Sequence, residues 1–289
     1  MKIRPRTRRV LIALDPAAPT SATLDALAGL VGAERPEICG LFIEDVTLLG
    51  LSSLSVVREV ALDTGAEDVM DTARLERQMH AQRVRVERML TGAMSRFSVQ
   101  PEFKVTRGRV RDELRREAQS ADLVVVGRSP RQAGARCWMG IRLGSLAAEI
   151  NGILAFVQDA WLTGKSVALV YDGTECASRC LALAQRIAAN ENLPMVAVLV
   201  GNPRDCSRWQ AALGSESAAP RVRQWHGIET PRLGDLPDVV RAANARVIVL
   251  PGHLEKQRPE LIESLLRQLE CSIVAVGEGL ETAATAHRK

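Results

Sequence analysis

The stretch Arg107–Arg128 reads RGRVRDELRREAQSADLVVVGR and is the most informative part of the chain for its fold. Within it, Val110–Ala118 places apolar residues at helical spacing among charged ones, which predicts an amphipathic helix. Leu123–Val126 is an unbroken aliphatic run closed by Gly127, which predicts a strand buried on both faces. A helix followed directly by such a strand indicates a parallel α/β unit.

The same alternation of strands and helices continues on both sides of this stretch. The predicted strands are Arg9–Leu14, Ile38–Ile43, Gln100–Thr106 and Ile153–Val157. The predicted helices are Thr20–Val31, the long amphipathic Asp68–Arg96 and Gly144–Ile150, and Val46–Gly65 is expected to be a loop with one helix. Strands separated by helices indicate a mainly parallel sheet covered on both faces.

From Lys165 the order of elements begins again, which predicts an internal repeat. The strands expected in the second copy are Ser166–Val170, Met195–Val200, Arg221–Trp225, Arg246–Leu250 and Ser272–Val276, with helices at Ala177–Ala189, Leu236–Ala243 and Pro259–Leu269. The boundary falls near Trp161–Gly164. We therefore predict two domains, residues 1–163 and 164–289, each a Rossmann-like, open, mainly parallel five-stranded sheet with helices on both faces.

Composition excludes several classes of function. The 289 residues carry a formal net charge of only +4 and 3% aromatic residues. Neither a strong positive field nor a stacking platform for nucleic acid is expected. The basic start of the chain lacks the apolar segment of a signal peptide, and no apolar run approaches the roughly 20 residues of a membrane span. We expect a soluble, cytoplasmic protein without nucleic-acid or membrane partners.

No motif of an enzyme or of a metal site is present. Cys176 and Cys180 are four residues apart and would share a helix face, as a redox pair or a metal-binding pair would, but we interpret them as core residues because no further ligands lie nearby. A site formed by Asp172 with His226 or His253 is the other alternative, and we interpret these residues as turn-forming, capping or surface groups. We expect neither catalytic residues nor metal ligands.

Together, the Arg107–Arg128 stretch, the first strand ending in Asp15 and the Gly144–Ser145 pair before a closing helix and strand resemble the universal stress protein family. The resemblance covers residues 9–157 well and residues 166–277 by the order of elements. It implies the fold described above, a stress-associated role and, in many members, binding of ATP, with Mg²⁺ as an accompanying ion. It also implies a dimer-like packing of the two copies, with a homodimer of the whole chain as a further arrangement.

The resemblance assigns a nucleotide site to the first copy. The residues that it implies are Asp15, Ile43, Gly127, Arg128, Gly144, Ser145 and Leu146. Glycines let backbone N–H groups approach phosphates, and a helix N-terminus favours an anion. The family's middle glycine is replaced by Pro130, and the loop to Gly144 is four residues longer than the family pattern, although arginines of the loop could offset the lost donor.

The second copy departs further from this pattern. Pro251 stands in the position of Gly127, and Glu263–Ser264 stands in the position of Gly144–Ser145. A carboxylate at a helix N-terminus occupies the place of a phosphate and repels it, so we expect no ATP in this copy.

Two function hypotheses follow. The first is a nucleotide-sensing regulatory protein whose first copy binds ATP, and the alternative is an interaction scaffold that binds protein partners and no nucleotide. An enzyme is the least favoured class because no catalytic constellation is recognised. Either way, we predict that Ile153–Val157 and Ser272–Val276 pair antiparallel, because unprotected aliphatic edge strands would invite aggregation.

Overall fold

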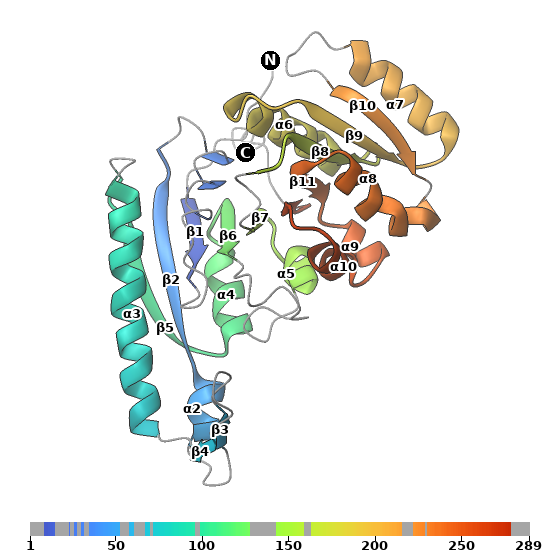
Figure 1. Cartoon of the computed structure of the whole chain (residues 1–289). Helices are drawn as coiled ribbons and strands as arrows, with labels where there is room; N and C mark the ends of the chain where they lie inside the picture. The colour runs from blue at the N-terminus through green and yellow to red at the C-terminus, as the bar shows by residue number, and fades with distance from the viewer. Residues whose placement is uncertain are drawn as a thin grey trace, which may run out of the picture.

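Ten strands form one continuous sheet in the computed structural model of the chain (Figure 1). The structure describes residues 9–14, 23, 26–27, 30–31, 35–52, 58–60, 67–69, 72–95, 99–127, 143–158, 163–215, 222–228 and 230–278. The order of the strands across the sheet is β10-β9-β8-β11-β12-β7-β6-β1-β2-β5. Counted within each half, the order outward from the centre is fifth, fourth, first, second and third strand in both halves.

The first half-sheet contains the strands β1 (Arg9–Ala13), β2 (Glu37–Asp45), β5 (Glu102–Gly108), β6 (Leu123–Gly127) and β7 (Ile153–Val157). The second half-sheet contains β8 (Ser166–Tyr171), β9 (Met195–Val200), β10 (Val222–Ile228), β11 (Ala245–Pro251) and β12 (Ser272–Val276). All neighbours within a half pair in parallel. The predicted α/β fold with a mainly parallel sheet is therefore confirmed. The domain division near residue 163 stays a prediction.

The two half-sheets meet at β7 and β12, which pair antiparallel with Phe156 opposite Ile273. The predicted pairing of the two closing strands is therefore confirmed. Side chains and backbone reinforce this joint: the Gln158 backbone N–H donates to Ser272 Oγ at 3.0 Å, and the Gly277 N–H donates to the Gly152 carbonyl at 2.9 Å. The apolar strands that would otherwise lie at sheet edges are thus placed in the middle of the sheet.

Helices cover both faces of the sheet. Around the first half lie α2 (Val46–Ser52), α3 (Thr72–Met94), α4 (Val110–Ala118) and α5 (Leu143–Glu149). Around the second lie α6 (Glu175–Asn190), α7 (Pro203–Ser215), the 3-10 helix η4 (Thr230–Asp235), α8 (Leu236–Ala242), α9 (Leu254–Gln257) and α10 (Leu261–Gln268). The helix α5 of the first half packs against α9 and α10 of the second (Figure 1).

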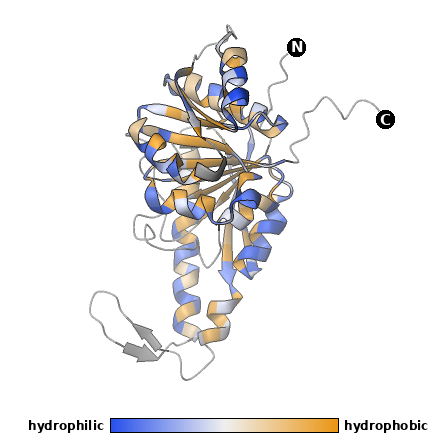
Figure 2. Cartoon of the chain, turned by 90° about the vertical axis from the view of Figure 1, so that its right-hand side faces the viewer, coloured by the Kyte–Doolittle hydropathy of each residue, from blue (hydrophilic) through white to orange (hydrophobic). Residues whose placement is uncertain are grey.

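Alternate residues of each strand enter opposite core layers. In β1, Leu11 belongs to the layer under α4, α5, α8 and α10, whereas Val10 and Ile12 belong to the layer under α3 and α6. Hydrophobic residues accordingly concentrate on the strands and on the inner sides of the helices (Figure 2). Each layer runs through both half-sheets, and fully burying one aliphatic side chain contributes about 1.5–3 kcal/mol. The two halves therefore share one core on each face.

The helix expected within Val46–Gly65 is α2, but two other regions differ from the sequence-based expectations. A hairpin of β3 (Arg58–Val60) and β4 (Glu67–Val69) was not expected, and α3 begins at Thr72 rather than at Asp68. A helix was expected from Pro259, but Glu260 adopts a left-handed backbone with φ of 69°, so α10 starts at Leu261. Residues 23, 26–27 and 30–31 of the expected first helix are helical, and its other residues lie outside the described part.

Among the described residues, no helix has both the length and the apolar character needed to cross a bilayer.

Candidate functional site

The expected nucleotide site falls at the carboxyl ends of the strands in the first half. Ile43 lies near the end of β2 and Gly127 ends β6, while Gly144, Ser145 and Leu146 lie in the first turn of α5. The side chains of Ile43 and Leu146 are buried in the core. Asp15, Arg128 and Pro130 lie outside the described residues, as does the rest of the loop up to residue 142. The described site residues thus come from three elements.

The N-terminus of α5 is already bonded to a carboxylate of the second half. The Gly144 N–H donates to Glu263 Oε1 at 2.9 Å in a buried contact. A Cβ added to Gly144 would lie 2.3 Å from Glu255 Oε1 and 2.5 Å from Glu263 Oε2. Two carboxyl groups of the second half therefore crowd around the glycine that was expected to contact phosphate.

Glu255 and Glu263 form a buried acid pair between α9 and α10. Glu255 accepts the Glu260 N–H at 2.7 Å and the Ile262 N–H at 2.9 Å, which caps α10. Burial raises the pKa of Glu255, the two N–H donors oppose this effect, and the charge of Glu263 adds to it. Glu263 Oε2 is buried and has no hydrogen-bond partner among the described residues.

Glu263 lies in the first turn of α10, at the helix start where the sequence placed its charge. Its side chain also accepts from α5 of the first copy, a contact that the sequence did not indicate, and Glu255 caps α10. A phosphate oxygen about 4 Å from an ionised Glu263 would be repelled by about 4 kcal/mol at an effective dielectric constant of about 20. That penalty lowers affinity by roughly a thousandfold.

A second group of polar side chains lies between β8 and β11, which are neighbouring parallel strands. Asp172 follows β8, and His253 comes two residues after β11. His253 Nε2 lies 2.7 Å from Asp172 Oδ2, and both side chains are only 10% exposed. These two strands are the first and fourth of the half-sheet, where the chain crosses from one side to the other and where open α/β sheets bind ligands.

The turn after β8 holds Asp172 in place. Asp172 Oδ1 accepts the Thr174 N–H at 3.1 Å and the Thr174 hydroxyl at 2.6 Å. Gly173 has a φ of 77°, and an added Cβ would lie 2.2 Å from the Trp209 ring, so only glycine fits here. Burial raises the pKa of Asp172, but hydrogen bonds from His253 and Thr174 outweigh it and lower the pKa overall.

Two cysteines complete this group from the first turns of α6. Thr174 caps the helix by accepting the Ala177 N–H at 3.1 Å, which places Cys176 in the first turn and Cys180 directly after it. The Cys176 sulfur lies 3.1 Å from the Val276 carbonyl oxygen, and both His253 and Cys180 are near enough to change the pKa of its thiol. Cys176 is 4% exposed and Cys180 is fully buried. Asp172, His253, Cys176 and Cys180 are called the thiol–histidine cluster below.

Charge is distributed unevenly in the thiol–histidine cluster. The bond to Asp172, followed by that to Cys176, raises the pKa of His253 to about 9. Hydrogen bonds from Cys180 and His253 outweigh burial and lower the pKa of Cys176 to about 5. Burial, followed by the contact with Cys176, raises the pKa of Cys180 well above its usual value. These shifts favour a charged imidazole at His253 and a neutral thiol at Cys180 at neutral pH.

One contact opposes the lowered pKa of Cys176. Its sulfur lies 3.1 Å from the Val276 carbonyl oxygen, a geometry that suits a neutral thiol donating to the carbonyl. A thiol is a weak donor, whereas the attraction between an imidazolium and a thiolate is strong in a poorly hydrated site. The carbonyl contact thus favours a thiol at Cys176, the neighbouring imidazolium favours a thiolate, and the pH dependence of stability distinguishes the two states.

The sequence analysis named the members of the thiol–histidine cluster but did not join them. It interpreted Cys176 and Cys180 as core residues, and the structure buries both of them in the core layer under α6. His226 lies in β10, separated from β8 by β9, and does not belong to the cluster. The positions of Asp172 and His253 along the chain could have indicated their contact. Asp172 follows the first strand of the second half and His253 follows the fourth, and the carboxyl ends of these two strands are neighbours in this fold.

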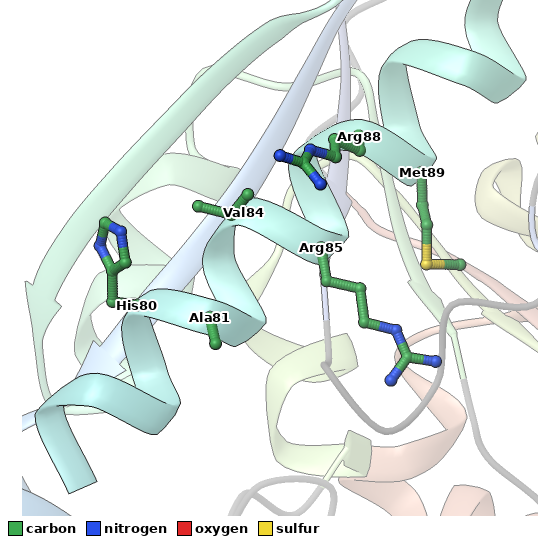
Figure 3. Close-up of a pocket in the computed structure, with 6 residues that line it drawn as sticks. All are labelled: His80, Ala81, Val84, Arg85, Arg88 and Met89. Atoms are coloured by element: carbon green, nitrogen blue, oxygen red, sulfur yellow. The ribbon is translucent and has the colours of Figure 1, made fainter. Parts of the chain in front are cut away.

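No described group of three or more His, Cys, Asp or Glu side chains is arranged to hold a metal ion. A surface depression runs along α3 (Figure 3) and is lined by His80, Ala81, Val84, Arg85, Arg88 and Met89. These residues come from a single helix. No acidic or thiol group from a second element joins them in the described lining, so we do not assign a site there.

The strand order and the joint between the half-sheets define the universal stress protein fold. A universal stress protein from Archaeoglobus fulgidus DSM 4304 superposes with a TM-score of 0.70 at 13% identity, over 96% of this chain and 98% of that chain. A functionally unknown protein from Pseudomonas aeruginosa PAO1 gives a TM-score of 0.56 at 14% identity, over 94% and 93% of the respective chains. No family model and no curated protein matches the sequence.

A candidate universal stress protein from Pseudomonas aeruginosa UCBPP-PA14 aligns over 94% of this chain and 93% of that chain, with a TM-score of 0.55 and 14% identity. At these identities the similarity establishes the fold. The resemblance inferred from Arg107–Arg128 is confirmed at that level.

Proposed function

We propose that this chain is a stress-associated regulatory protein of the universal stress protein fold that acts without a bound nucleotide, as an interaction scaffold. One observation carries the proposal: Glu263 accepts the Gly144 N–H at 2.9 Å, where the family pattern would place a phosphate. Because Glu255 lies against the same glycine, a nucleotide would have to displace two buried carboxyl groups. The second half thus closes the site of the first.

An ATP sensor is the competing candidate. Gly127, Gly144 and Ser145 occupy the strand end and helix start that the family pattern requires. In that case ATP, with Mg²⁺, would bind the first half and push Glu263 away from α5, which would couple binding to the contact between the halves. The two candidates differ in whether the chain binds ATP at all.

The test is titration calorimetry of the whole chain with Mg·ATP, together with native mass spectrometry of the purified protein for co-purifying nucleotide. We expect no saturable binding and no nucleotide. Saturable binding of one ATP that Ser145→Glu abolishes would overturn the proposal and support the sensor.

Exposed apolar side chains on α2 support the scaffold role. Val46, Leu48 and Leu51 are 37–44% exposed on this one short helix. A photo-crosslinking amino acid at position 48 in living cells should give a discrete adduct that Leu51→Glu weakens, whereas the same group at the exposed position Arg208 should not. Equal labelling from both positions would contradict a partner at α2. The ATP titration tests nucleotide binding separately, so its result would still stand.

A further inference from the structure

We propose that the outer edge of β5 is a dimerisation surface, on which a second copy of this chain adds its own β5 in the antiparallel direction. Two ten-stranded sheets are then joined into one through the strand Glu102–Gly108. This inference is independent of the proposed function, because it uses neither the start of α5 nor the exposed face of α2. It rests on a comparison of the two sheet edges and on the residue at the midpoint of β5.

The two edge strands, β5 in the first half and β10 in the second, lie at opposite ends of the sheet (Figure 1). The pairing of β10 with β9 is irregular between Val222 and Gln224, and α7 and η4 pack against β10. A bulge bends an edge strand and hinders its pairing with another chain. In contrast, β5 pairs with β2 over seven consecutive residues without an irregularity. Of the two edges, β5 is therefore the one suited to pairing.

The outer side of β5 has no partner strand among the described residues. Unpaired N–H and C=O groups along such an edge form a template for another strand, and charged side chains commonly protect it. In β5 these charges are Lys104 and Arg107, and both are held by the same chain. Lys104 Nζ lies 2.7 Å from Glu117 Oε2, and Arg107 Nε lies 3.0 Å from Glu44 Oε2. The two charges are therefore paired before a second strand arrives.

Val105 stands at the midpoint of β5 and is 37% exposed. The other large apolar side chains of comparable exposure in the described part of the chain lie on α2. When two identical edge strands pair antiparallel about a twofold axis, one residue lies at the axis and faces its own copy. With Val105 in this place all seven residues of β5 gain a partner, and the two exposed valines cover each other.

The neighbouring side chains favour the same register. Phe103 faces Arg107 of the second copy, so that a guanidinium group can lie against an aromatic ring, and Lys104 faces Thr106. A register centred on Lys104 would instead place two ammonium groups directly opposite each other. One centred on Thr106 would place the apolar Val105 opposite Arg107. Both of these alternatives also pair fewer residues, so the strand selects the register centred on Val105.

The antiparallel direction determines which other elements meet. The helix α2 follows the end of β2 at Asp45, which pairs with Gly108 at the end of β5. In the dimer the end of one β5 lies beside the start of the other, so the two α2 helices are at opposite ends of the joint. Each α2 thus remains accessible to the protein partner considered above. A strand pair of this length is smaller than a standard stable interface, so we expect a dimer that dissociates on dilution.

The experiment measures the oligomeric state of the full-length chain by sedimentation velocity from roughly 1 to 300 μM. We expect a reversible equilibrium between monomer and dimer. Val105→Lys should weaken dimerisation at least about tenfold, because two like charges then meet at the axis. Because Val105 is exposed, the folded monomer should persist, which circular dichroism and thermal unfolding check. Gln224→Lys is the matched control: it adds the same charge at an exposed position of the other edge strand and should leave dimerisation unchanged.

A charge exchange tests the position of the axis. Val105→Glu alone should also weaken dimerisation, whereas an equimolar mixture of Val105→Lys and Val105→Glu should restore it, because opposite charges then face each other. A chain that stays monomeric at every concentration, or a Val105→Lys variant that dimerises like the parent, would overturn the proposal. So would loss of the dimer with Gln224→Lys, or a mixture that stays monomeric. The ATP titration is unaffected by each of these results, so the two proposals fail separately.

Discussion

In the first half-sheet the N-terminus of α5 is bonded to Glu263 of the other half, whereas in the second half-sheet the edge between β8 and β11 is filled by its own Asp172 and His253. Both places lie at the carboxyl ends of parallel strands, where open α/β sheets bind ligands. The first is closed by a carboxyl group that comes from 119 residues away, and the second is converted into a thiol–histidine cluster. The same fold thus carries different polar groups at the carboxyl ends of the strands in its two halves.

The comparison shows that a carboxylate of the neighbouring half can satisfy a buried N–H donor at a helix start. The Gly144 N–H still needs an acceptor once it is buried, because an unpaired buried donor costs about 1–3 kcal/mol. The carboxylate of Glu263, which comes from the other half, accepts this hydrogen bond in the way that a phosphate oxygen would. A sequence that retains the glycine is therefore a weak sign of nucleotide binding.

The largest expected effect tests the second half. Asp172→Ala leaves His253 without its partner and removes the acceptor of two Thr174 bonds, so the free energy of unfolding should fall by about 4 kcal/mol. Urea denaturation measures the loss. Asp238→Ala removes the partner of Arg241 in an ion pair that is mostly exposed, and should change stability by less than about 1 kcal/mol. Equal losses would show that the Asp172–His253 pair has no special role.

The next effect tests the closed site of the first half. Gly144→Ala puts a methyl group 2.3–2.5 Å from two carboxylate oxygens, so the free energy of unfolding should fall by about 2–3 kcal/mol. Gly92→Ala in α3 is the control, because its Cβ meets nothing within 4 Å and helix propensity predicts a gain of about 0.5–1 kcal/mol. A neutral Gly144→Ala would mean that Glu255 and Glu263 do not press on α5.

A pH titration tests the thiol–histidine cluster of the second half. His253 has a pKa near 9 in place of 6.5, so its stabilisation is complete below pH 6.5 and is lost as pH rises through 9. Cys176 has a pKa near 5 in place of 9, so its stabilisation is complete above pH 9 and is lost as pH falls through 5. Between pH 6.5 and 9 the contributions of His253 and Cys176 to the pH dependence of the free energy of unfolding cancel. The charged pair in the folded chain and the neutral pair in the unfolded chain hold the same number of protons.

Of these two contributions, only that of Cys176 changes below pH 6.5, and the stability that Cys176 adds should fall by about 2 kcal/mol between pH 6.5 and 5. Cys176→Ser should lack this decrease while keeping all other titrating groups, including Glu255. Chemical denaturation of both proteins across this range gives the difference directly. Parallel pH profiles would show that Cys176 is a thiol in the folded chain.

The smallest effect is a gain in stability. In Glu263→Gln the side-chain oxygen can still accept the Gly144 N–H, while the new amide replaces the unpartnered Oε2 and donates to Glu255. The free energy of unfolding at neutral pH should rise by about 1 kcal/mol. Glu263→Met has a similar size but no acceptor, and should be destabilising. Thermal unfolding compares the three proteins, and a loss with Gln would contradict the proposed acid pair.

Much of the fold could be predicted because it depends on local pattern. Continuous aliphatic runs such as Leu123–Val126 and Ser272–Val276 become strands buried on both faces, and their order in the chain restricts the topology. The β3–β4 hairpin was missed because its strands have three residues each and no alternating apolar pattern. The left-handed Glu260 was missed because nothing local favours this conformation over a helical one.

The sites were less predictable because they depend on distant contacts. Gly144 and Glu263 are 119 residues apart, and Asp172 and His253 are 81 residues apart. Family resemblance placed Gly144 correctly at the start of a helix but could not show which group would bind it. For the thiol–histidine cluster, the strand order 5-4-1-2-3 was the missing information, because it makes β8 and β11 neighbours.

The joint between β7 and β12 has a consequence for how such a protein can evolve. In an assembly of two identical subunits, a single gene mutation appears on both sides of the interface, so a glutamate that closes one site must also appear beside its symmetric counterpart. Here both central strands belong to one polypeptide, so a substitution in one half is not repeated in the other. Glu263 can therefore face Gly144 without a second glutamate at the corresponding position of the first half. Folding is also independent of protein concentration, because the partner strand is always tethered.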